Sequence, residues 1–541
     1  MTPLVTLALI LSSSGVLAEP VQKPDIQLPA SAAANKAAVV DIFTRSYNAY
    51  KEFAFGHDDL SPLSKSFSDG RNGWGASIVD AMSTMSIMGL EDFLQEAIDF
   101  SSKIDFSRSK TSDTVSVFET TIRYLAGLLS TYELSGKKFP ALVDRARELG
   151  DKMAFAFSRN NVIPFGFLNF TTNAPTIDNS NIAEAGTLTL DWGTLSKYTG
   201  NQTYADLTIG SVAHIAQLAA PLPGLAAQGI DPRTGNFVGG YVTWGGGSDS
   251  YFEYLIKHAR LSNTNDNLFA DTWATAVDSS IRTLMKTSTV GGHVYLADFD
   301  DNRNIRHIGS HLACFMGGNW LFGGRLLNNQ TIVDIGLQLT DACWNTYAST
   351  VSGIGPEAFA FISADGNFTG GSAATRAELD FYNKHGFYTT NGVYILRPEV
   401  LESNFYAFRV TGDPKYLDRA ASAVKSFNEF LATPNGFAAL NDVNNPIGGG
   451  QIDDTESFWF AEVLKYLYLT FDDPNHISLD KFVFNTEAHP FEAPPLKASY
   501  GSGKLLAPKS GFVAKTGSPL PEISPNVKVG PSTHFPGEGS K

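Results

Sequence analysis

Apolar residues recur at three- and four-residue steps along much of the chain, and this periodicity constrains the fold more than any other feature. The clearest runs are Val79–Met88, Phe118–Leu129, Phe405–Val410 and Phe458–Leu469. Such spacing gathers apolar side chains on one face of an α-helix. Gly-, Pro- and Asn-rich joints separate the runs, and the sequence shows neither a series of βαβ units nor a glycine-rich phosphate loop after a strand. We therefore expect a helical protein and not a nucleotide-binding fold.

One phrase repeats weakly at the ends of such runs. Leu195–Tyr204 and Phe408–Tyr416 each contain an apolar helix end, a Thr-Gly pair and a tyrosine five residues after the threonine; Tyr132–Phe139 is a looser copy. A glycine that stops one helix before another begins is typical of a helix-hairpin corner. Repeated hairpins favour a closed or stacked helical architecture, although coincidental similarity between common helix caps explains the repeat equally well.

Charge and composition narrow the class of ligand. The 541 residues include 55 Asp and Glu against 40 Lys and Arg, which gives a formal net charge of −15. Because a broad basic footprint is needed to bind nucleic acid, we expect no such partner. Hydrophobic residues make up 43% of the chain and aromatic residues 12%, enough for a large core. The aromatics suit sugar-stacking surfaces, but a large aromatic core is the simpler interpretation.

The N-terminus resembles a secretory signal. Its apolar region, Leu4 to Ala18, is too short to span a bilayer comfortably and ends in the small-residue pattern Val16-Leu17-Ala18. We therefore predict a signal peptide over residues 1–18, cleavage after Ala18 and secretion, without stable membrane insertion. A short membrane anchor is the alternative, but no Lys or Arg flanks the segment.

Secretion gives meaning to two further features. Asn-x-Ser/Thr sequons mark candidate N-glycosylation sites at Asn169, Asn201, Asn329 and Asn367. Cys314 and Cys343 are the two cysteines of the chain, so they can form a single intramolecular bridge in an oxidising compartment. Two buried free thiols are the alternative.

The C-terminal end differs from the rest in composition. Residues 491–541 hold eight of the 26 prolines, together with many Gly, Ser and Lys residues and no apolar periodicity. We predict a flexible tail there and one folded domain over residues 35–490.

Several carboxylates lie inside apolar helical runs, where an unpaired charge is costly. Glu119 and Arg123 are four residues apart, which places an acid and a cation on one helix face. Asp249 and Glu253 are two acids at the same spacing. Further acids in similar contexts are Glu399, Glu402, Glu462 and Glu487, with Pro398 placing Glu399 near a helix N-terminus. Each alone suits an ordinary ion pair; together they indicate a cation site or acid–base chemistry on a glycosidic bond.

Eight ordered motifs over residues 38–490 resemble glycoside hydrolase family 47, the class I α-1,2-mannosidases, most closely the secreted fungal type. The motifs are Gly73–Ala81, Phe118–Gly127, Asp249–Lys257, His311–Phe315, Gly353–Glu357, Leu396–Glu399, Glu462–Tyr468 and Val483–Pro490. The resemblance implies a single catalytic (α/α)7 barrel of helix hairpins, which agrees with the repeated corners.

The resemblance also implies the chemistry of the site. It implies inverting hydrolysis with one Ca²⁺, bound through the carbonyl and hydroxyl oxygens of Thr486, with waters and substrate hydroxyls completing the shell. Glu399 is implied as the base that activates water; Glu119, acting through a water, or Asp249 is implied as the acid. The residues implied around the ion and the bound mannose are Asp80, Arg123, Glu253, His311, Arg397, Glu402, Glu462 and Glu487. Cys314 and Cys343 match the disulfide of the family.

Three positions depart from the family pattern. Gly247 stands where the endoplasmic-reticulum enzymes that remove one mannose carry Arg, so we expect a wider cleft and trimming of several mannoses. Asp191 is one methylene shorter than the usual Glu, which puts any role of that acid in doubt. Ser83 replaces an Asp and is expected to cost a contact within its helix.

The sequence therefore predicts a secreted protein with a single catalytic domain, and we expect a monomer. Its expected activity is calcium-dependent, inverting release of terminal α-1,2-linked mannose from Man9GlcNAc2-type N-glycans on oligosaccharides or glycoproteins. The alternative is a lectin-like quality-control protein that binds high-mannose glycoproteins with little turnover.

Overall fold

A computed structural model describes residues 19–368, 371–509 and 511–512. The predicted signal peptide over residues 1–18 therefore lies outside the described residues. The α-helices are α1 (Ser31–Phe53), α2 (Ala76–Met88), α3 (Glu91–Ser101), α4 (Val117–Glu119), α5 (Ala126–Leu134), α6 (Pro140–Met153), α7 (Ile182–Gly186), α8 (Thr189–Thr199), α9 (Thr203–Gln217), α10 (Asp249–Ser262), α11 (Leu268–Ser279), α12 (Met316–Leu326), α13 (Gln330–Ala348), α14 (Arg376–His385), α15 (Glu399–Thr411), α16 (Lys415–Ser426) and α17 (Leu464–Phe471).

Irregular helical turns continue several of these helices. The π-helical segments are η1 (Thr120–Leu125), η3 (Ser280–Leu284), η5 (Phe427–Leu431) and η6 (Trp459–Val463), and the 3₁₀ segments are η2 (Ala154–Asn160) and η4 (Leu312–Phe315). Two of the π-helical segments, η1 and η6, lie beside carboxylates of the predicted site, and π-helical turns are frequent at functional sites.

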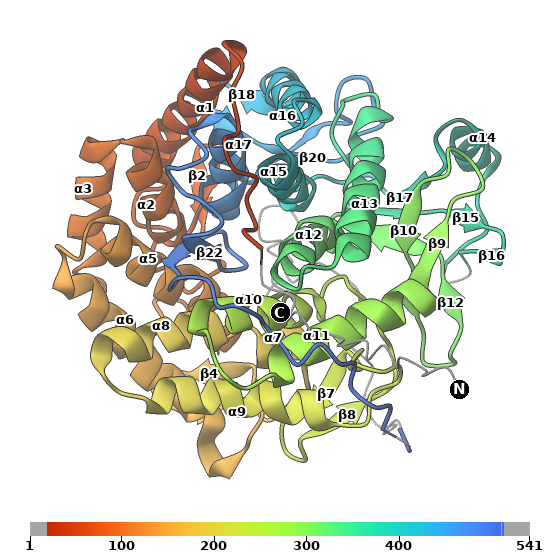
Figure 1. The fold of residues 1–541 in the computed structure, drawn as a ribbon. Coiled ribbons are helices and arrows are strands. Elements are labelled where there is room, and N and C mark those ends of the chain that lie inside the picture. The colour runs from red at the N-terminus through yellow and green to blue at the C-terminus, as the bar shows by residue number, and fades with distance from the viewer. Residues whose placement is uncertain (1–18, 369–370, 510, 513–541) are drawn as a thin grey trace, which may run out of the picture.

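Seven helices form a closed inner ring (Figure 1). Neighbours in the ring contact one another in the order α2, α5, α8, α10, α12, α15, α17 and back to α2. Each inner helix also packs against an outer one, in the same order α3, α6, α9, α11, α13, α16 and α1. The predicted (α/α)7 barrel of helix hairpins is therefore confirmed.

The repeated phrase marks real corners of this barrel. Leu195–Tyr204 joins α8 to α9, Phe408–Tyr416 joins α15 to α16, and Tyr132–Phe139 joins α5 to α6. Gly200 and Gly412 adopt left-handed backbone conformations with φ of 71° and 66°, as expected for glycine after a helix C-terminus.

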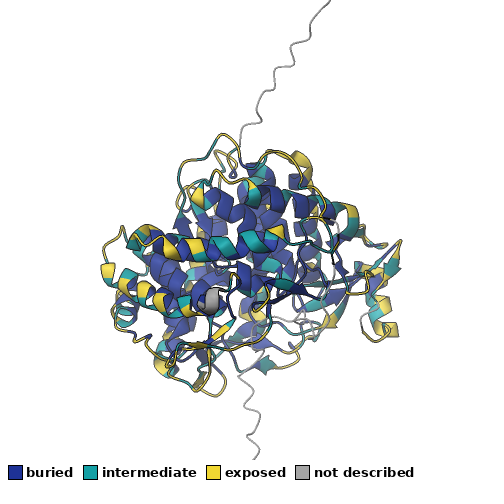
Figure 2. Ribbon diagram, turned by 90° about the horizontal axis from the view of Figure 1, so that it is seen from below, coloured by how far each residue is buried: buried dark blue, intermediate teal, exposed yellow. Residues whose placement is uncertain are grey.

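Buried residues fill the interior of the molecule and exposed ones lie at its periphery (Figure 2). The inner helices are buried almost all round, whereas outer helices such as α16 alternate buried and exposed residues. Six of the seven tryptophans are among the largest fully buried side chains. Much of the aromatic content therefore serves the core.

Short antiparallel hairpins connect the helices. The strands are β1 (Asp59–Ser61), β2 (Ser66–Ser68), β3 (Val115–Ser116), β4 (Phe167–Asn169), β5 (Ala174–Pro175), β6 (Ser180–Asn181), β7 (Gly229–Asp231), β8 (Asn236–Val238), β9 (Met285–Thr287), β10 (Val294–Leu296), β11 (Asp298–Phe299), β12 (Ile305–Arg306), β13 (Ile308–Ser310), β14 (Ala358–Ala360), β15 (Ile362–Ser363), β16 (Gly366–Asn367), β17 (Tyr388–Asn391), β18 (Ala432–Thr433), β19 (Gly436–Phe437), β20 (Ala439–Leu440), β21 (Gln451–Ile452), β22 (Phe482–Phe484) and β23 (Pro490–Glu492).

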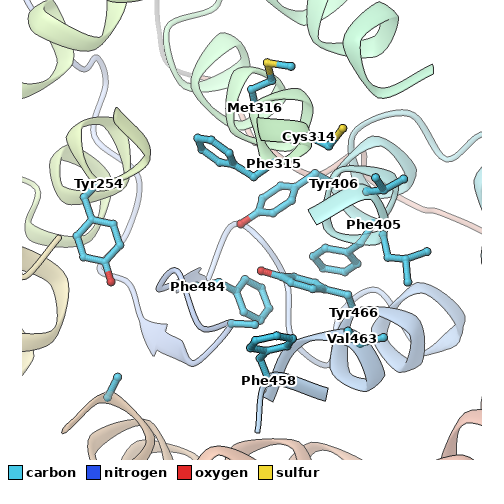
Figure 3. Close-up of a cluster of buried hydrophobic side chains, with 14 of the residues drawn as sticks. Tyr254, Cys314, Phe315, Met316, Phe405, Tyr406, Phe458, Val463, Tyr466 and Phe484 are labelled. Atoms are coloured by element: carbon cyan, nitrogen blue, oxygen red, sulfur yellow. The ribbon is translucent and has the colours of Figure 1, made fainter. Parts of the chain in front are cut away.

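The hairpin of β22 and β23 fills the inside of the ring. Phe484 packs against Phe405 of α15 and Tyr466 of α17, with ring centroids 5.8 Å from each (Figure 3). On the other strand, Pro490 O accepts a hydrogen bond from Ser130 Oγ of α5 at 2.8 Å. These contacts fix the turn between the strands, which carries Thr486 and Glu487.

The folded unit extends beyond both expected boundaries. Val21 is fully buried and its N–H donates to Asp480 at 2.7 Å, upstream of the expected start at residue 35. Phe491 is fully buried in β23, after the expected end at residue 490. Neither segment is helical, so neither shows the apolar periodicity by which the sequence marks the domain. Residues 513–541 of the predicted tail lie outside the described residues.

A C-terminal strap, residues 493–509 and 511–512, continues from β23 over α10 and α11. Tyr500 is buried and its hydroxyl donates to Asn263 Oδ1 at 2.9 Å. The backbone N–H of Ser502 donates to Asp271 Oδ1 at 2.7 Å, and that of Leu506 to Thr275 Oγ1 at 2.9 Å.

Within the described ranges, no helix combines the length and apolar character that crossing a membrane requires.

Candidate active site

The N-terminal ends of several inner-ring segments converge on one pocket, the inner pocket. It has a volume of about 80 Å³, and the turn of the β22–β23 hairpin contributes to its wall. The charged and metal-candidate residues that line it are Glu119, Arg123, Asp249, Arg397, Glu399, Glu462, Thr486 and Glu487. All three predicted catalytic residues therefore line the same pocket. Asp80, Glu253, His311 and Glu402 do not line it, and they contact or influence the residues that do.

Glu399 is the first residue of α15, directly after Pro398. His311 Nδ1 lies 2.7 Å from Glu399 Oε2, and Arg397 Nη1 lies 3.7 Å from Oε1. Burial alone would raise the pKa of Glu399, but the His311 hydrogen bond and the Arg397 charge together hold it below its ordinary value. The helix N-terminus favours the same ionised form. Glu399 is therefore a carboxylate at neutral pH.

Asp249 is the first residue of α10 and has a different electrostatic environment. Burial raises its pKa to about 7, against hydrogen bonds from Ser250, and the charges of Glu253 and Glu399 add to the rise. A carboxyl group with this pKa carries its proton for part of the time near neutral pH, as a general acid must.

Glu119 ends α4, and its backbone N–H donates to Ser116 Oγ at 3.2 Å. Arg123 Nε donates to Glu119 Oε2 at 2.8 Å, which confirms the ion pair expected from the four-residue spacing. The Glu119 side chain is 18% exposed, against 2% for Glu487. Glu119 therefore lies at the outer edge of the buried acids.

Arg123 links Glu119 to the turn of the β22–β23 hairpin. Its Nη1 contacts Glu487 closely and lies 3.6 Å from Asp80 Oδ2. Asp80 in turn accepts a hydrogen bond from Ser457 Oγ at 2.5 Å. Asp80 is fully buried in α2, so it acts on the pocket through Arg123.

The acids near the hairpin turn outnumber the cations. Burial, followed by the charges of Glu487, Glu399 and Glu402, raises the pKa of Glu462 well above its ordinary value. Burial and the charge of Glu253 likewise raise the pKa of Glu402, while Lys257 opposes the rise by its charge. Lys257 pairs closely with Glu253. This excess of buried negative charge is the environment that a bound cation would stabilise.

Thr486 supplies oxygens at the same place. It lies in the turn at the inner pocket, and its backbone N–H is 3.4 Å from the hydroxyl of Tyr254. Among the described residues, no hydrogen bond is formed by Thr486 Oγ1 or its carbonyl oxygen, and no three His, Cys, Asp or Glu side chains form a metal-ligand group. Two free oxygens among carboxylates that can hold waters fit a hard cation with a partly hydrated shell. The residues present therefore fit Ca²⁺.

Asp191 lies behind the hairpin turn. It accepts hydrogen bonds from Tyr254 Oη and Asn485 Nδ2, both at 3.0 Å. Burial raises the pKa of Asp191 to about 7 against these hydrogen bonds. Because Asn485 precedes Thr486, the shorter acid still positions the turn.

Ser83 and Gly247, the other two departures from the family pattern, both lie near the site. Ser83 Oγ lies 2.9 Å from His489 Nδ1 in the hairpin, so its contact is long-range and not within its helix. Gly247 lines the inner pocket with φ of 83°, and an added Cβ would lie 2.9 Å from Gln228 Nε2. A side chain there would strain the backbone and crowd Gln228.

Sequence reasoning missed several residues that support the site. Arg71 donates to Glu456 at 2.9 Å, and its Nε lies 3.7 Å from Glu119 Oε2. Tyr347 Oη lies 2.8 Å from His311 Nε2, and Glu357 accepts from Arg397 Nε at 2.7 Å. Glu357 lies within the motif Gly353–Glu357, and Arg71 lies two residues before the motif Gly73–Ala81. Closeness to these motifs is the sequence signal that could have identified both residues.

The sequons and cysteines lie apart from the pocket. Asn169, Asn201, Asn329 and Asn367 are all exposed. Cys314 of η4 and Cys343 of α13 form a disulfide, as the resemblance implied.

The chain is similar to known proteins over most of its length. The glycosyl hydrolase family 47 profile matches residues 42–493. The probable mannosyl-oligosaccharide alpha-1,2-mannosidase 1B of Aspergillus clavatus is 40% identical over 90% of this chain and 98% of its own. The mannosyl-oligosaccharide alpha-1,2-mannosidase of Penicillium citrinum is 38% identical over the same shares. The solved alpha-1,2-mannosidase from Trichoderma reesei superposes with a TM-score of 0.82 at 38% identity, over 85% of this chain and 99% of that one.

A closed barrel of helix hairpins around a pocket of carboxylates suits a glycosidase, whose chemistry uses a pair of carboxyl groups. The family match and the relatives specify which kind. The chain belongs to glycosyl hydrolase family 47 and is an α-1,2-mannosidase.

Proposed function

We propose that the protein releases terminal α-1,2-linked mannose from Man9GlcNAc2-type N-glycans by inverting hydrolysis, with Ca²⁺ at Thr486. One observation carries the proposal: the inner pocket holds Glu399 with a lowered pKa and Asp249 with a pKa of about 7. Two carboxyl groups whose pKa values are pushed apart divide the work of base and acid.

In this proposal Glu399 takes a proton from the attacking water. The hydrogen bond with His311 and the nearby charge of Arg397 fix its orientation and keep it ionised. Tyr347 on one side and Glu357 on the other hold those two partners. The base is therefore preorganised by contacts from several elements.

The acid delivers a proton to the glycosidic oxygen as the bond to the departing sugar breaks. Asp249 is supported by its raised pKa, and Glu119, acting through a water, by its position at the outer edge of the buried acids. Both residues are candidates, and the pH dependence of kcat/KM in the Asp249→Asn variant distinguishes them.

The proposed cation would be held by the two oxygens of Thr486, with waters placed by Glu462, Glu487 and Glu402. When bound, Ca²⁺ would grip hydroxyls of the mannose and offset the negative charge of these acids. Arg123 would hold Glu487 in position through its close ion pair.

We also propose that several mannoses are removed and that the enzyme acts as a secreted, glycosylated monomer. Gly247 supports broad trimming because it leaves the pocket wall without a side chain. The N-terminal sequence, the disulfide and the exposed sequons support passage through the secretory pathway. One domain carries every proposed site residue, which supports a monomer.

The test is digestion of Man9GlcNAc2 with and without EDTA, for the wild type and for Glu399→Gln. Glu52→Gln, on the exposed surface of α1, is the matched control. We expect EDTA to abolish mannose release and added Ca²⁺ to restore it. Glu399→Gln should lower kcat by roughly 10²–10⁴-fold, while Glu52→Gln should match the wild type. Activity that survives both EDTA and Glu399→Gln would overturn the mechanism, and trimming that stops at one Man8 isomer would overturn the broad specificity.

A further inference from the structure

A second cavity, the outer cavity, adjoins the inner pocket. It has a volume of about 330 Å³, and it shares Phe118 and Glu119 with the inner pocket. This volume is within the range of small-ligand sites, about 300–1,000 Å³. Because Glu119 belongs to both walls, the two spaces meet at this carboxylate.

Polar side chains form part of the outer cavity. Arg71, Asn72, Ser116 and Glu184 line it. Arg71 is paired with Glu456, so its charge is already compensated. Such a wall suits hydrogen bonding to a neutral polyhydroxylated ligand.

Phe167 is the exposed apolar side chain on this wall, whereas Phe118 is buried. Its side chain is apolar, lines the outer cavity and is 40% exposed. Among the described residues, the rings that pack on one another do not include Phe167, whereas Tyr124, on the same wall, packs against Trp74 and Phe106. One face of the ring is therefore available to a ligand.

The backbone holds Phe167 rigidly relative to Glu119. Phe167 pairs with Ser116 in the β3–β4 ladder, and Ser116 Oγ caps the helix that carries Glu119. On either side, Val117 N–H donates to Gly166 O at 2.9 Å and Thr176 N–H donates to Phe167 O at 2.8 Å. A ring fixed on a strand loses little freedom when a ligand stacks on it.

We infer that Phe167 is a specificity-determining residue, on which a mannose of the departing part of the glycan stacks. This inference rests on the proposed function, since it takes the inner pocket as the site of the mannose that is released. The departing sugar must then lie outside the inner pocket, and the outer cavity adjoins that pocket at Glu119, one of the two candidate acids. A pyranose presents an apolar C–H face, and burying that face against an exposed ring removes apolar surface from water.

The test compares Phe167→Ala with Phe155→Ala. Phe155 is a matched control because its side chain is 44% exposed and it lines neither the inner pocket nor the outer cavity. Phe167→Tyr retains the ring. For each variant, KM and kcat are measured with Man9GlcNAc2, and Ki is measured for the mannose analogue 1-deoxymannojirimycin, which is a single ring and has no departing sugar to contact Phe167.

For Phe167→Ala we expect KM to rise about tenfold, the equivalent of one lost aromatic contact, with kcat and Ki within twofold of the wild type. Phe167→Tyr and Phe155→Ala should match the wild type. An unchanged KM in Phe167→Ala, an equal rise in Phe155→Ala, or a parallel rise in Ki would overturn the inference alone. A wild type that does not turn over Man9GlcNAc2 would overturn the proposed function and the inference with it.

Discussion

At the scale of single residues, the site depends on how environment separates chemically similar carboxyl groups. Glu399 is buried and Asp249 is half-buried, and both begin a helix, yet their pKa values shift in opposite directions. The difference comes from partners: His311 and Arg397 face Glu399, whereas Asp249 meets two other acids. Each pKa can be followed in the pH dependence of activity.

The alkaline side of the pH profile tests Asp249. Because its raised pKa is about 7, the protonated form prevails below that pH and is lost above it. If Asp249 is the acid, kcat/KM of the wild type should fall as pH rises through about 7, and Asp249→Asn should remove this limb. A variant that loses rate but keeps the same limb would assign the acid to Glu119 instead.

The acidic side tests the positioning role of His311. Its hydrogen bond helps to lower the pKa of Glu399 against burial, which raises it. In His311→Phe, the pKa of Glu399 should therefore rise, and the acidic limb of kcat/KM should move to higher pH. Since only the ionised base is active, activity should recover toward higher pH. A limb that stays in place, with a uniform loss at all pH values, would indicate a merely structural role.

At the scale of elements, the β22–β23 hairpin and the C-terminal strap form one continuous segment that supports the inner pocket. The hairpin places Thr486 at the inner pocket, and the strap ties the end of the hairpin to α10 and α11. Asp249 begins α10. The strap is thus a brace on the helix that carries a candidate acid.

Truncation separates this support from the remaining tail. A chain ending at residue 493 should lose roughly 2–4 kcal/mol of unfolding free energy, because it loses several hydrogen bonds and the buried Tyr500. A chain ending at residue 512 should unfold like the full-length protein in thermal or urea denaturation. Equal stability of the two truncated chains would show that the strap contributes nothing.

Local sequence predicted the elements whose signal lies within a few residues. The four-residue spacing of Glu119 and Arg123, the position of Glu399 after Pro398, and the Thr-Gly corners all have counterparts in the structure. Contacts across the barrel could not be predicted in this way. Ser83 contacts His489, and Arg71 contacts Glu456. These pairs are far apart in the sequence, and they meet because the ring of helices closes. The strap lacked any periodicity, so composition marked it as tail.

At the scale of the whole molecule, the acidic excess acquires a physical reason. Acids distant in sequence, from Glu119 to Glu487, meet in one pocket because the inner helices direct their N-terminal ends to the same place. The resulting negative charge is costly without a cation. The arrangement that brings the proposed catalytic acids together therefore also accounts for the proposed requirement for Ca²⁺.

The anomeric form of the released mannose tests the central claim most directly. Proton NMR during Man9GlcNAc2 hydrolysis resolves α- and β-mannose before they interconvert. Since Glu399 is proposed to activate a water on the face opposite the departing sugar, β-mannose should appear first. Initial release of α-mannose would contradict inversion, and the absence of any release would favour a glycan-binding protein over the enzyme.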